Sequence, residues 1–334
     1  MGIDSIFLIT LVIVIAALAF DFINGFHDTA NAIATSVSTK ALRPRVAIVL
    51  AAVMNFLGAM TFTGVAKTIT KDIVDPFTLN NGSTVILAAL LAAIAWNLIT
   101  WYYGIPSSSS HALIGSIAGA AIASAGIASL NYKGFFKILQ ALLISPLIAF
   151  ALGFIIYLIF KIGFKNLNLA KTNKRFRYLQ IATAALQAYT HGTNDAQKAM
   201  GIITMALIAN GFRTTTDIPF WVQFSCALAM GLGTSVGGWK IIKTVGGKIM
   251  KIRPVNGVAA DLSSAMIIFG ATFIHLPVST THVISSSILG VGTSHRVKGV
   301  KWDTAQRMLI TWFITLPITG TLAGICYYIL NLFM

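Results

Sequence analysis

Two polar phrases occur twice in this chain, in the same order in each half and inside otherwise apolar segments. GFHDTANA at 25–32 returns as GTNDAQKA at 192–199, and PSSSSH at 106–111 returns as PVSTTH at 277–282. The aspartates of the first pair are 167 residues apart in a chain of 334 residues. Such a duplication is typical of secondary transporters, in which the site lies at the interface between two repeats.

The composition indicates that these phrases lie in a bilayer. Hydrophobic residues make up 56% of the chain, charged residues only 10%, and the mean hydropathy is +0.82. A water-soluble protein of this length would expose large apolar patches with such a composition. We therefore predict an all-α polytopic membrane protein.

The net charge of +15 comes from 24 Lys and Arg against nine Asp. Such an excess is also common in nucleic-acid-binding proteins, but here the basic residues cluster in short connectors between apolar spans. We expect no nucleic-acid partner. Cys226 and Cys326 lie in apolar segments without CxxC spacing, so we interpret them as small buried hydrophobic residues.

A helix needs about 20 apolar residues to cross a bilayer, and each half of the chain contains five apolar stretches near that length. An odd number per half gives the halves opposite orientations. We predict two inverted-topology repeats, 1–160 and 178–334, joined by a basic linker at 161–177. The candidate spans are 5–37, 46–66, 84–103, 111–128, 138–160, 178–210, 219–239, 256–275, 281–294 and 305–330.

Some of these spans do not have the length of a straight crossing. The stretch 5–37 is too long and 281–294 is too short, which favours broken or re-entrant helices. We expect the first span to break at Asn24 and Gly25, and 178–210 to break near His191 and Gly192. In this interpretation the glycines free main-chain groups for ligands.

The connectors alternate in charge, as the positive-inside rule requires. Basic residues are concentrated in 40–45, 161–177, 240–253 and 294–301, which places the N-terminus outside and the central linker in the cytoplasm. On this count 104–110, without Lys or Arg, falls on the inner side. The segment before the first motif lacks a basic n-region, so we expect a membrane span and not a cleaved signal. The expected location is the cell (inner) membrane.

Each Asp motif presents a carboxylate and a polar neighbour on one helical face. Asp28 and Asn31 are three residues apart, as are Asp195 and Lys198, with Asn194 beside the second carboxylate. An intramembrane charge costs at least ~2.5 kcal/mol, so it usually has a function. We predict a coupling-ion site shared by both motifs. The structural alternative is that Asp195 only pairs with Lys198 while Asp28 is held by its polar neighbours as packing glue.

The Ser/Thr runs predict an anion site. Each run follows a proline and precedes an apolar helical stretch, where hydroxyls, free first-turn amides and the helix dipole favour negative charge. In an inverted duplication two such helix starts would converge on one tetrahedral oxyanion. A single run would be no more than an ordinary helix cap. The candidate anion-binding residues are Ser108, Ser109, Ser110, Ser279, Thr280 and Thr281.

Five further residues are candidates with less support. His111 and His282 follow the runs and either bond the anion or are structural. Asp21 lies seven residues before Asp28, and Asp261 lies before the second hairpin; each is a proton-path or helix-pairing residue. His27 lies directly before Asp28.

At these motifs the sequence resembles the inorganic phosphate transporter (Pit) family over nearly its whole length. The resemblance implies inverted repeats, phosphate held by the two Ser/Thr hairpins, coupling ions near the two Asp motifs, and a homodimer. The sodium-coupled members carry Ala and Asn where this chain has Gln197 and Lys198, and Asn where it has His27. The Gln-Lys form resembles the bacterial proton-coupled, low-affinity branch, which also moves metal–phosphate complexes.

We therefore predict a symporter of inorganic phosphate and protons, with no cofactor and no resident metal. Lys198 adds a fixed charge where sodium would need an oxygen ligand. Magnesium or another divalent metal travelling with phosphate, sodium coupling, and another oxyanion such as sulfate stay open as alternatives. A passive channel would need a continuous polar pore. A hydrolase is disfavoured because Ser110 and His111 are adjacent on a helix and point in different directions.

Overall fold

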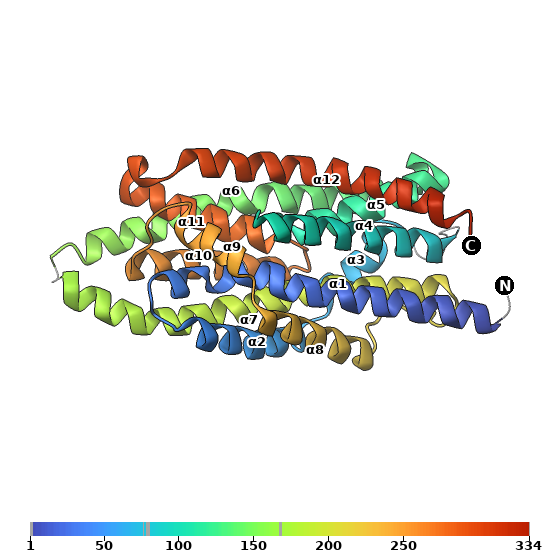
Figure 1. Ribbon diagram of the computed structural model, residues 1–334, viewed down its shortest axis with the longest axis horizontal. Coiled ribbons are helices and arrows are strands. Elements are labelled where there is room, and N and C mark those ends of the chain that lie inside the picture. Colours follow the sequence, from blue (N-terminus) through green and yellow to red (C-terminus); the bar gives the residue numbers. More distant parts are fainter. Residues whose placement is uncertain (1–2, 76, 78–80, 167–168, 334) are drawn as a thin grey trace.

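The computed structural model describes residues 3–75, 77, 81–166 and 169–333, and this part of the chain is almost entirely helical (Figure 1). The all-α prediction is confirmed. The first half contains α1 (Ile3–Ser38), α2 (Pro44–Ala59), α3 (Gly64–Asp72), α4 (Gly82–Tyr103), α5 (Ser109–Ala125) and α6 (Tyr132–Gly163). The second half contains α7 (Leu169–Ala209), α8 (Phe220–Val236), α9 (Trp239–Gly247), α10 (Pro254–Phe273), α11 (Thr280–Arg296) and α12 (Trp302–Leu330).

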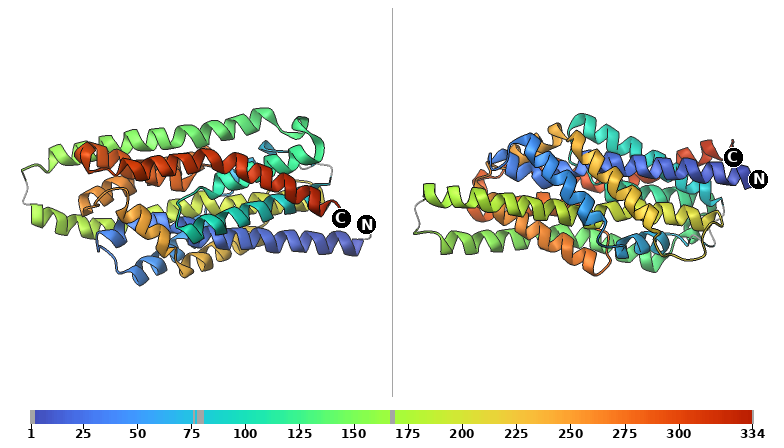
Figure 2. Two further views of the ribbon diagram at one scale, coloured as in Figure 1. Left: turned by 45° about the horizontal axis from the view of Figure 1, so that its top comes forward. Right: turned by 90° about the horizontal axis from the view of Figure 1, so that it is seen from below.

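The second half has the same order of elements as the first, but its helices run in the opposite direction through the molecule. Each half has a long helix, a bent pair, a helical hairpin, a 3-10 turn and a second long helix. α1 starts at the end of the molecule where both termini lie, whereas α7 starts at the other end (Figures 1 and 2). α6 and α12 likewise run in opposite directions, as expected for inverted repeats.

The helix breaks occur in the second helix of each half and not in the first. α1 and α7 are continuous through Gly25 and Gly192, so the predicted breaks at these glycines are wrong. Instead, α2 and α3 form a pair bent by 68°, and α8 and α9 one bent by 74°. The predicted spans 46–66 and 219–239 each cross one of these bends.

The two glycines allow close helix crossings. A Cβ atom on Gly25 would lie 2.5 Å from the Met230 carbonyl oxygen on α8, and one on Gly192 would lie 2.3 Å from the Asn55 carbonyl oxygen on α2. Both contacts join the first helix of one half to the second helix of the other half. The glycines therefore serve packing between the halves, because only a residue without Cβ lets the backbones approach so closely.

The hairpins α4–α5 and α10–α11 enter from opposite ends of the molecule, and their tips meet near its middle (Figure 1). The prediction that 104–110 lies at the inner surface is therefore wrong, because this segment is a buried tip. Five described helices are long and apolar enough to cross a membrane, or seven spans if each bent pair counts as one. By length and composition this number is lower than the ten predicted spans, because hydropathy reports burial but not whether a helix turns back halfway.

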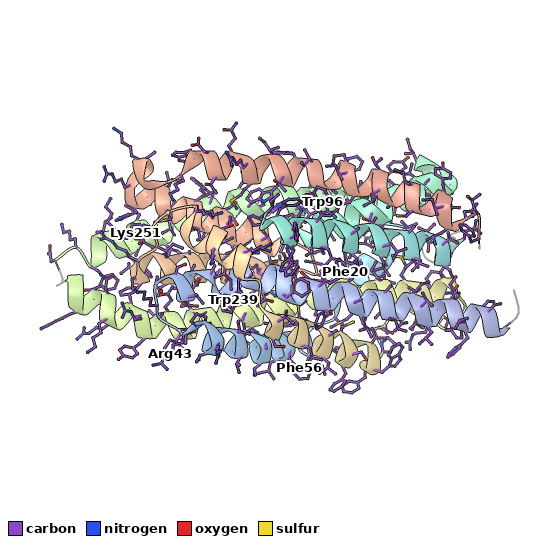
Figure 3. All side chains as sticks on the ribbon, in the orientation of Figure 1. Phe20, Arg43, Phe56, Trp96, Trp239 and Lys251 are labelled. Carbon is purple, nitrogen blue, oxygen red and sulfur yellow. The ribbon has the colours of Figure 1, made fainter. Side chains whose placement is uncertain are left out.

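Two apolar clusters lie on either side of the middle of the bundle. One contains Ile13, Phe20 and Leu90, and the other contains Ile48, Ile242 and Ile288. Figure 3 marks Phe20, which is fully buried. The polar motifs are buried between these clusters.

The end opposite the termini carries the basic connectors, where Figure 3 marks Arg43 and Lys251. Helices extend into much of the predicted linker, because α6 continues to Gly163 and α7 begins at Leu169. Only a short connector separates them, and residues 167–168 lie outside the described part of the chain. Basic residues in 169–177 therefore belong to the first turns of α7, whereas the sequence alone placed them in the linker.

Candidate functional site

Asp28 on α1 contacts both hairpin tips. Ser109, at the start of α5, donates a hydrogen bond to Asp28 Oδ2, and Thr281 Oγ1 on α11 donates to Oδ1 at 3.1 Å. His27 Nδ1 lies 2.6 Å from the same Oδ1. Asp28 is 1% exposed and every one of these partners is buried. The carboxylate thus joins the two repeats through the residues that the sequence assigned to the anion site.

Asp195 on α7 occupies the equivalent position. Its Oδ1 accepts a hydrogen bond from Lys198 Nζ at 2.6 Å, and its Oδ2 accepts from Thr280 Oγ1 at 3.0 Å. The same ammonium donates to Ser110 Oγ at 2.5 Å. His191 Nε2 lies 3.3 Å from the other side of the carboxylate. The Asp195–Lys198 ion pair considered as the structural alternative is therefore present, but it also contacts both tips.

The hydroxyls of each Ser/Thr run have two different roles. Ser108 is the N-cap of α5 and accepts from the His111 amide at 3.1 Å, and Ser279 does the same for α11 with the His282 amide at 3.2 Å. Of the next two residues in each run, Ser109, Thr280 and Thr281 donate to the carboxylates, and Ser110 accepts from Lys198. Ser110 Oγ also donates to the Val278 carbonyl oxygen at 2.9 Å, which links the two tips directly. Two helix N-termini consequently meet at the site.

The asparagines of the motifs fix the tips in place. Asn31 Nδ2 donates to Thr281 Oγ1 at 2.9 Å, while its side-chain oxygen is buried without a hydrogen-bond partner. Asn194 accepts from the Val278 amide at 3.2 Å and donates to Thr272 Oγ1 at 3.0 Å. All these predicted coupling residues therefore lie around the hairpin tips.

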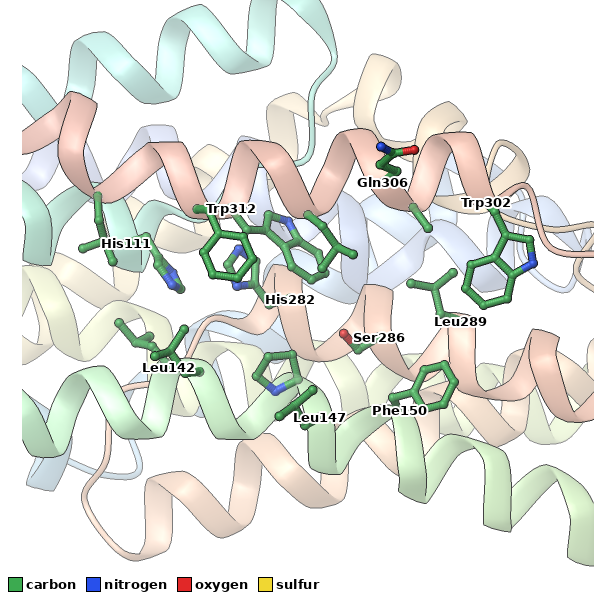
Figure 4. Close-up of a pocket in the computed structure, with 16 residues that line it drawn as sticks. His111, Leu142, Leu147, Phe150, His282, Ser286, Leu289, Trp302, Gln306 and Trp312 are labelled. Carbon is green, nitrogen blue, oxygen red and sulfur yellow. The ribbon is translucent and has the colours of Figure 1, made fainter. Parts of the chain in front are cut away.

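His111 and His282 lie behind the tips. Their ring centroids are 4.4 Å apart, and His282 stacks on Trp312 at 3.9 Å. Both line a mainly apolar cavity of about 500 Å³ bordered by α6 and α12 (Figure 4). His111 Nδ1 lies 2.8 Å from the Ser108 hydroxyl, so this ring contacts the cap and not the hydroxyls that face the carboxylates.

Asp261 and Asp21 lie on opposite sides of the tips. Asp261 on α10 accepts hydrogen bonds from Thr35 at 2.7 Å and Thr183 at 2.9 Å, so it ties α1, α7 and α10 together. Asp21 lies nearer the N-terminus of α1 than Asp28. Both its oxygens are buried and neither has a hydrogen-bond partner.

The sequence analysis named Asn24 and His191 as break points of their spans and not as site residues. Asn24 Oδ1 lies 3.0 Å from the Ser109 hydroxyl, and His191 Nδ1 lies 2.9 Å from Asn55 Oδ1. Their spacing was the available signal, because each lies one helical turn before the Asp of its motif. The amino-acid sequence alone did not identify their partners, which lie on other helices.

Polar and apolar residues differ sharply between the two sides of the site. Toward the basic end, α1, α7 and α10 contribute a connected polar set, and Gln187 Oε1 accepts from Ser264 at 2.8 Å. The repeat-equivalent residues toward the terminal end are apolar and buried. By the offsets of the two motif pairs, the polar–apolar equivalents are Thr35 and Ile202, Gln187 and Phe20, Gln180 and Ile13, and Asp261 and Leu90.

At the terminal end, the connector between α7 and α8 is tied to α3. Lys67 Nζ lies 2.6 Å from Asp217 Oδ1, and its hydrogen bond and positive charge hold the pKa of the Asp217 carboxyl below its ordinary value. The Lys67 and Asp217 side chains are 43% and 68% exposed, so this pair adds little to the stability of the fold. It lies away from the tips.

In the described ranges, no group of three or more His, Cys, Asp or Glu side chains has the arrangement of a metal site.

The comparison with known proteins identifies the class of molecule. The sequence profile of the phosphate transporter family matches residues 24–171 and 164–323, which together span most of the chain. The chain belongs to the phosphate transporter family.

Two relatives agree with this assignment over nearly their full length. The chain is 80% identical over 330 residues to the "Probable low-affinity inorganic phosphate transporter" of Bacillus subtilis (strain 168), covering 98% of this chain and 99% of the relative. It is 43% identical to the protein of the same name from Rhizobium meliloti (strain 1021), covering 96% of each. The phosphate transporter is thus a multi-pass membrane protein, and its relatives are transporters and not enzymes.

A solved structure also resembles this phosphate transporter. "The sodium-dependent phosphate transporter" superposes with a TM-score of 0.84 at 26% identity, covering 98% of this chain and 100% of the other. The fold and the family therefore agree, and phosphate is the substrate of the family.

Proposed function

We propose that this transporter is a proton-coupled phosphate symporter that works by alternating access. The observation that carries the proposal is the position of the Lys198 ammonium. It is fully buried, 2.6 Å from Asp195 and 2.5 Å from Ser110. A side-chain cation therefore occupies the place beside the carboxylate that a bound sodium ion would take. Because Lys has no acceptor atom, it removes a sodium ligand as well.

Phosphate would bind at the hairpin tips by accepting the hydrogen bonds that the tip hydroxyls now donate to carboxylates. Ser109 and Thr281 now donate to Asp28, and Thr280 donates to Asp195. An anion between the two helix N-termini would take these hydroxyl donors and the first-turn amides. A protonated phosphate can also donate to a carboxylate, which sulfate in its dianionic form cannot do. The closeness of hydroxyls and carboxylates supports phosphate over sulfate.

The asymmetry between the two sides supports the basic end as the side from which water and phosphate would enter once it opens, since its polar residues are buried in this structure. Polar side chains such as Thr35, Gln187 and Asp261 favour water on that side, while Phe20 and Leu90 exclude it on the other. We assign the basic end to the cytoplasm, with the N-terminus outside and the protein in the cell (inner) membrane. The first repeat, 1–160, and the second, 178–334, would rock against each other around the tips.

Sodium coupling is the second candidate, favoured by the 26% identical solved transporter whose title calls it sodium-dependent. Transport of a magnesium–phosphate complex and a homodimeric assembly remain predictions from the family resemblance. We rank protons first because Lys198 supplies a permanent charge within the coupling motif.

The test is uptake of labelled phosphate into proteoliposomes under separately imposed pH and sodium gradients. The proposal expects accumulation with an inward proton gradient and none with a sodium gradient. Uptake that follows sodium and ignores pH would overturn it. Varying magnesium at fixed free phosphate tests the metal complex, and excess sulfate tests anion selectivity.

A further inference from the structure

We propose that Asp21 is the carboxyl group that binds the coupled proton, an assignment that rests on the proposed proton coupling. The sequence analysis predicted that Asp28 and Asp195 bind the coupling ion. In the structure both are held by donors: Asp28 by two hydroxyls and His27, and Asp195 by Lys198 and Thr280. The oxygens of both carboxylates therefore already have polar partners in the structure.

Asp21 has the opposite surroundings. It is 0% exposed, and neither oxygen has a hydrogen-bond partner. Ala17 and Ile13, one and two turns earlier on the same face of α1, are fully buried as well. An ionised carboxylate without donors is among the most costly groups to bury, whereas a neutral carboxylic acid costs much less. The closed arrangement around Asp21 is therefore compatible with a proton on this group.

The groups around Asp21 fit a bound proton better than a bound metal cation. The titratable groups that interact with it electrostatically are Asp195 and Lys198 on α7 and Cys226 on α8. α4 also packs against α1 and has no Asp, His, Lys or Arg, and Gly238 at the N-cap of α9 lies against Phe26, beyond Asp21 on α1. Metal cations need several oxygen ligands, and among the described residues Asp21 belongs to no group of three or more His, Cys, Asp or Glu side chains that could hold one.

Asn24 connects Asp21 to the phosphate-binding tips. It lies one turn after Asp21, so both side chains are on one face of α1. Its Nδ2 is buried without a partner, while its Oδ1 lies 3.0 Å from Ser109 Oγ. Ser109 in turn donates to Asp28. The polar series therefore leads from Asp21 along α1 into the tip of the first hairpin.

This position explains how a proton and phosphate would move together. A negative charge on Asp21 would repel an anion at the tips, and protonation removes that repulsion. Proton binding thus strengthens phosphate binding, and by linkage phosphate strengthens proton binding. The repeat-equivalent of Asp21 is Ala188, a buried apolar residue, so the duplication supplies only one such carboxyl.

The experiment compares Asp21→Asn with wild type, with Asp21→Glu, and with Asp303→Asn at the exposed start of α12 as the matched control. Two activities are measured in proteoliposomes at zero membrane potential. The first is exchange of labelled for unlabelled phosphate, which moves no net proton. The second is accumulation of phosphate driven by a pH gradient, with proton entry followed by a pH-sensitive dye inside the vesicles.

For one proton per phosphate, wild type and Asp303→Asn should accumulate phosphate about tenfold per pH unit. Asp21→Asn should keep exchange but show an accumulation ratio near one and no phosphate-dependent proton entry, and Asp21→Glu should restore both. Accumulation by Asp21→Asn equal to wild type would overturn the inference, as would loss of exchange in Asp21→Asn, because Asp21 would then serve binding or folding. A wild-type protein that ignores the pH gradient would instead refute the proposed function itself.

Discussion

Replacing Lys198 by Met tests the centre of the site, because Met has a similar length and no charge. The ammonium is fully buried and holds Asp195 at 2.6 Å and Ser110 at 2.5 Å. Removing one partner of a buried ion pair leaves the other charge uncompensated, which costs about 3–5 kcal/mol. We expect Lys198→Met to lose that amount of unfolding free energy. Replacing both residues, Lys198→Met with Asp195→Asn, should recover a large part of the loss.

Unfolding by sodium dodecyl sulfate in mixed micelles, followed by tryptophan fluorescence, measures both variants. A single variant within about 1 kcal/mol of wild type would refute the reasoning, since removing one partner of a buried ion pair should destabilise the fold by more than that. So would a double variant no more stable than the single one. Lys198→Asn adds a functional test: it restores an oxygen ligand, so sodium at 100 times its Kd should stabilise it by about 2.7 kcal/mol but leave wild type unchanged.

Two further predictions concern packing and substrate binding. Gly192→Ala should lower the unfolding free energy by about 1–3 kcal/mol, because its Cβ would lie 2.3 Å from the Asn55 carbonyl oxygen. Gly163→Ala, where a Cβ meets open space, is the control, and equal stability of the two variants would contradict the close-packing role. Thr281→Ala should raise the KM for phosphate by about tenfold to a hundredfold, the worth of one hydrogen bond to a charged group, and Thr281→Ser should not. An unchanged KM in Thr281→Ala would remove this hydroxyl, which now binds Asp28, from the phosphate site.

Local chemistry made part of the site predictable. Ser108 and Ser279 cap the helices that the Ser/Thr runs predicted, since an N-cap depends on a side chain and an amide three residues apart. The pairing of Asp195 with Lys198 also follows from spacing on one helix. Each of these contacts lies within one helical turn.

Contacts between distant segments were not predictable in the same way. Asp28 reaches Thr281 across 253 residues of sequence, and Thr35 reaches Asp261 across 226. The function of Gly25 was misread for the same reason: a glycine signals conformational freedom, but whether that freedom bends a helix or admits a neighbouring backbone depends on what lies beside it. In this fold the neighbour is α8, at the Met230 carbonyl.

The sequence by itself determined the class of the protein: a duplicated, helical membrane transporter with two carboxylate motifs and two hydroxyl-rich helix starts. These conclusions depend on composition, period and short spacing, which are local properties of the chain. Only the tertiary structure decided that the hairpins turn back in the middle, that α1 and α7 are continuous, and that Asp28 and Asp195 are held by donors while Asp21 is not. The reason is that hydropathy reports whether a residue leaves water, whereas its partners and its depth depend on which distant helices pack against it.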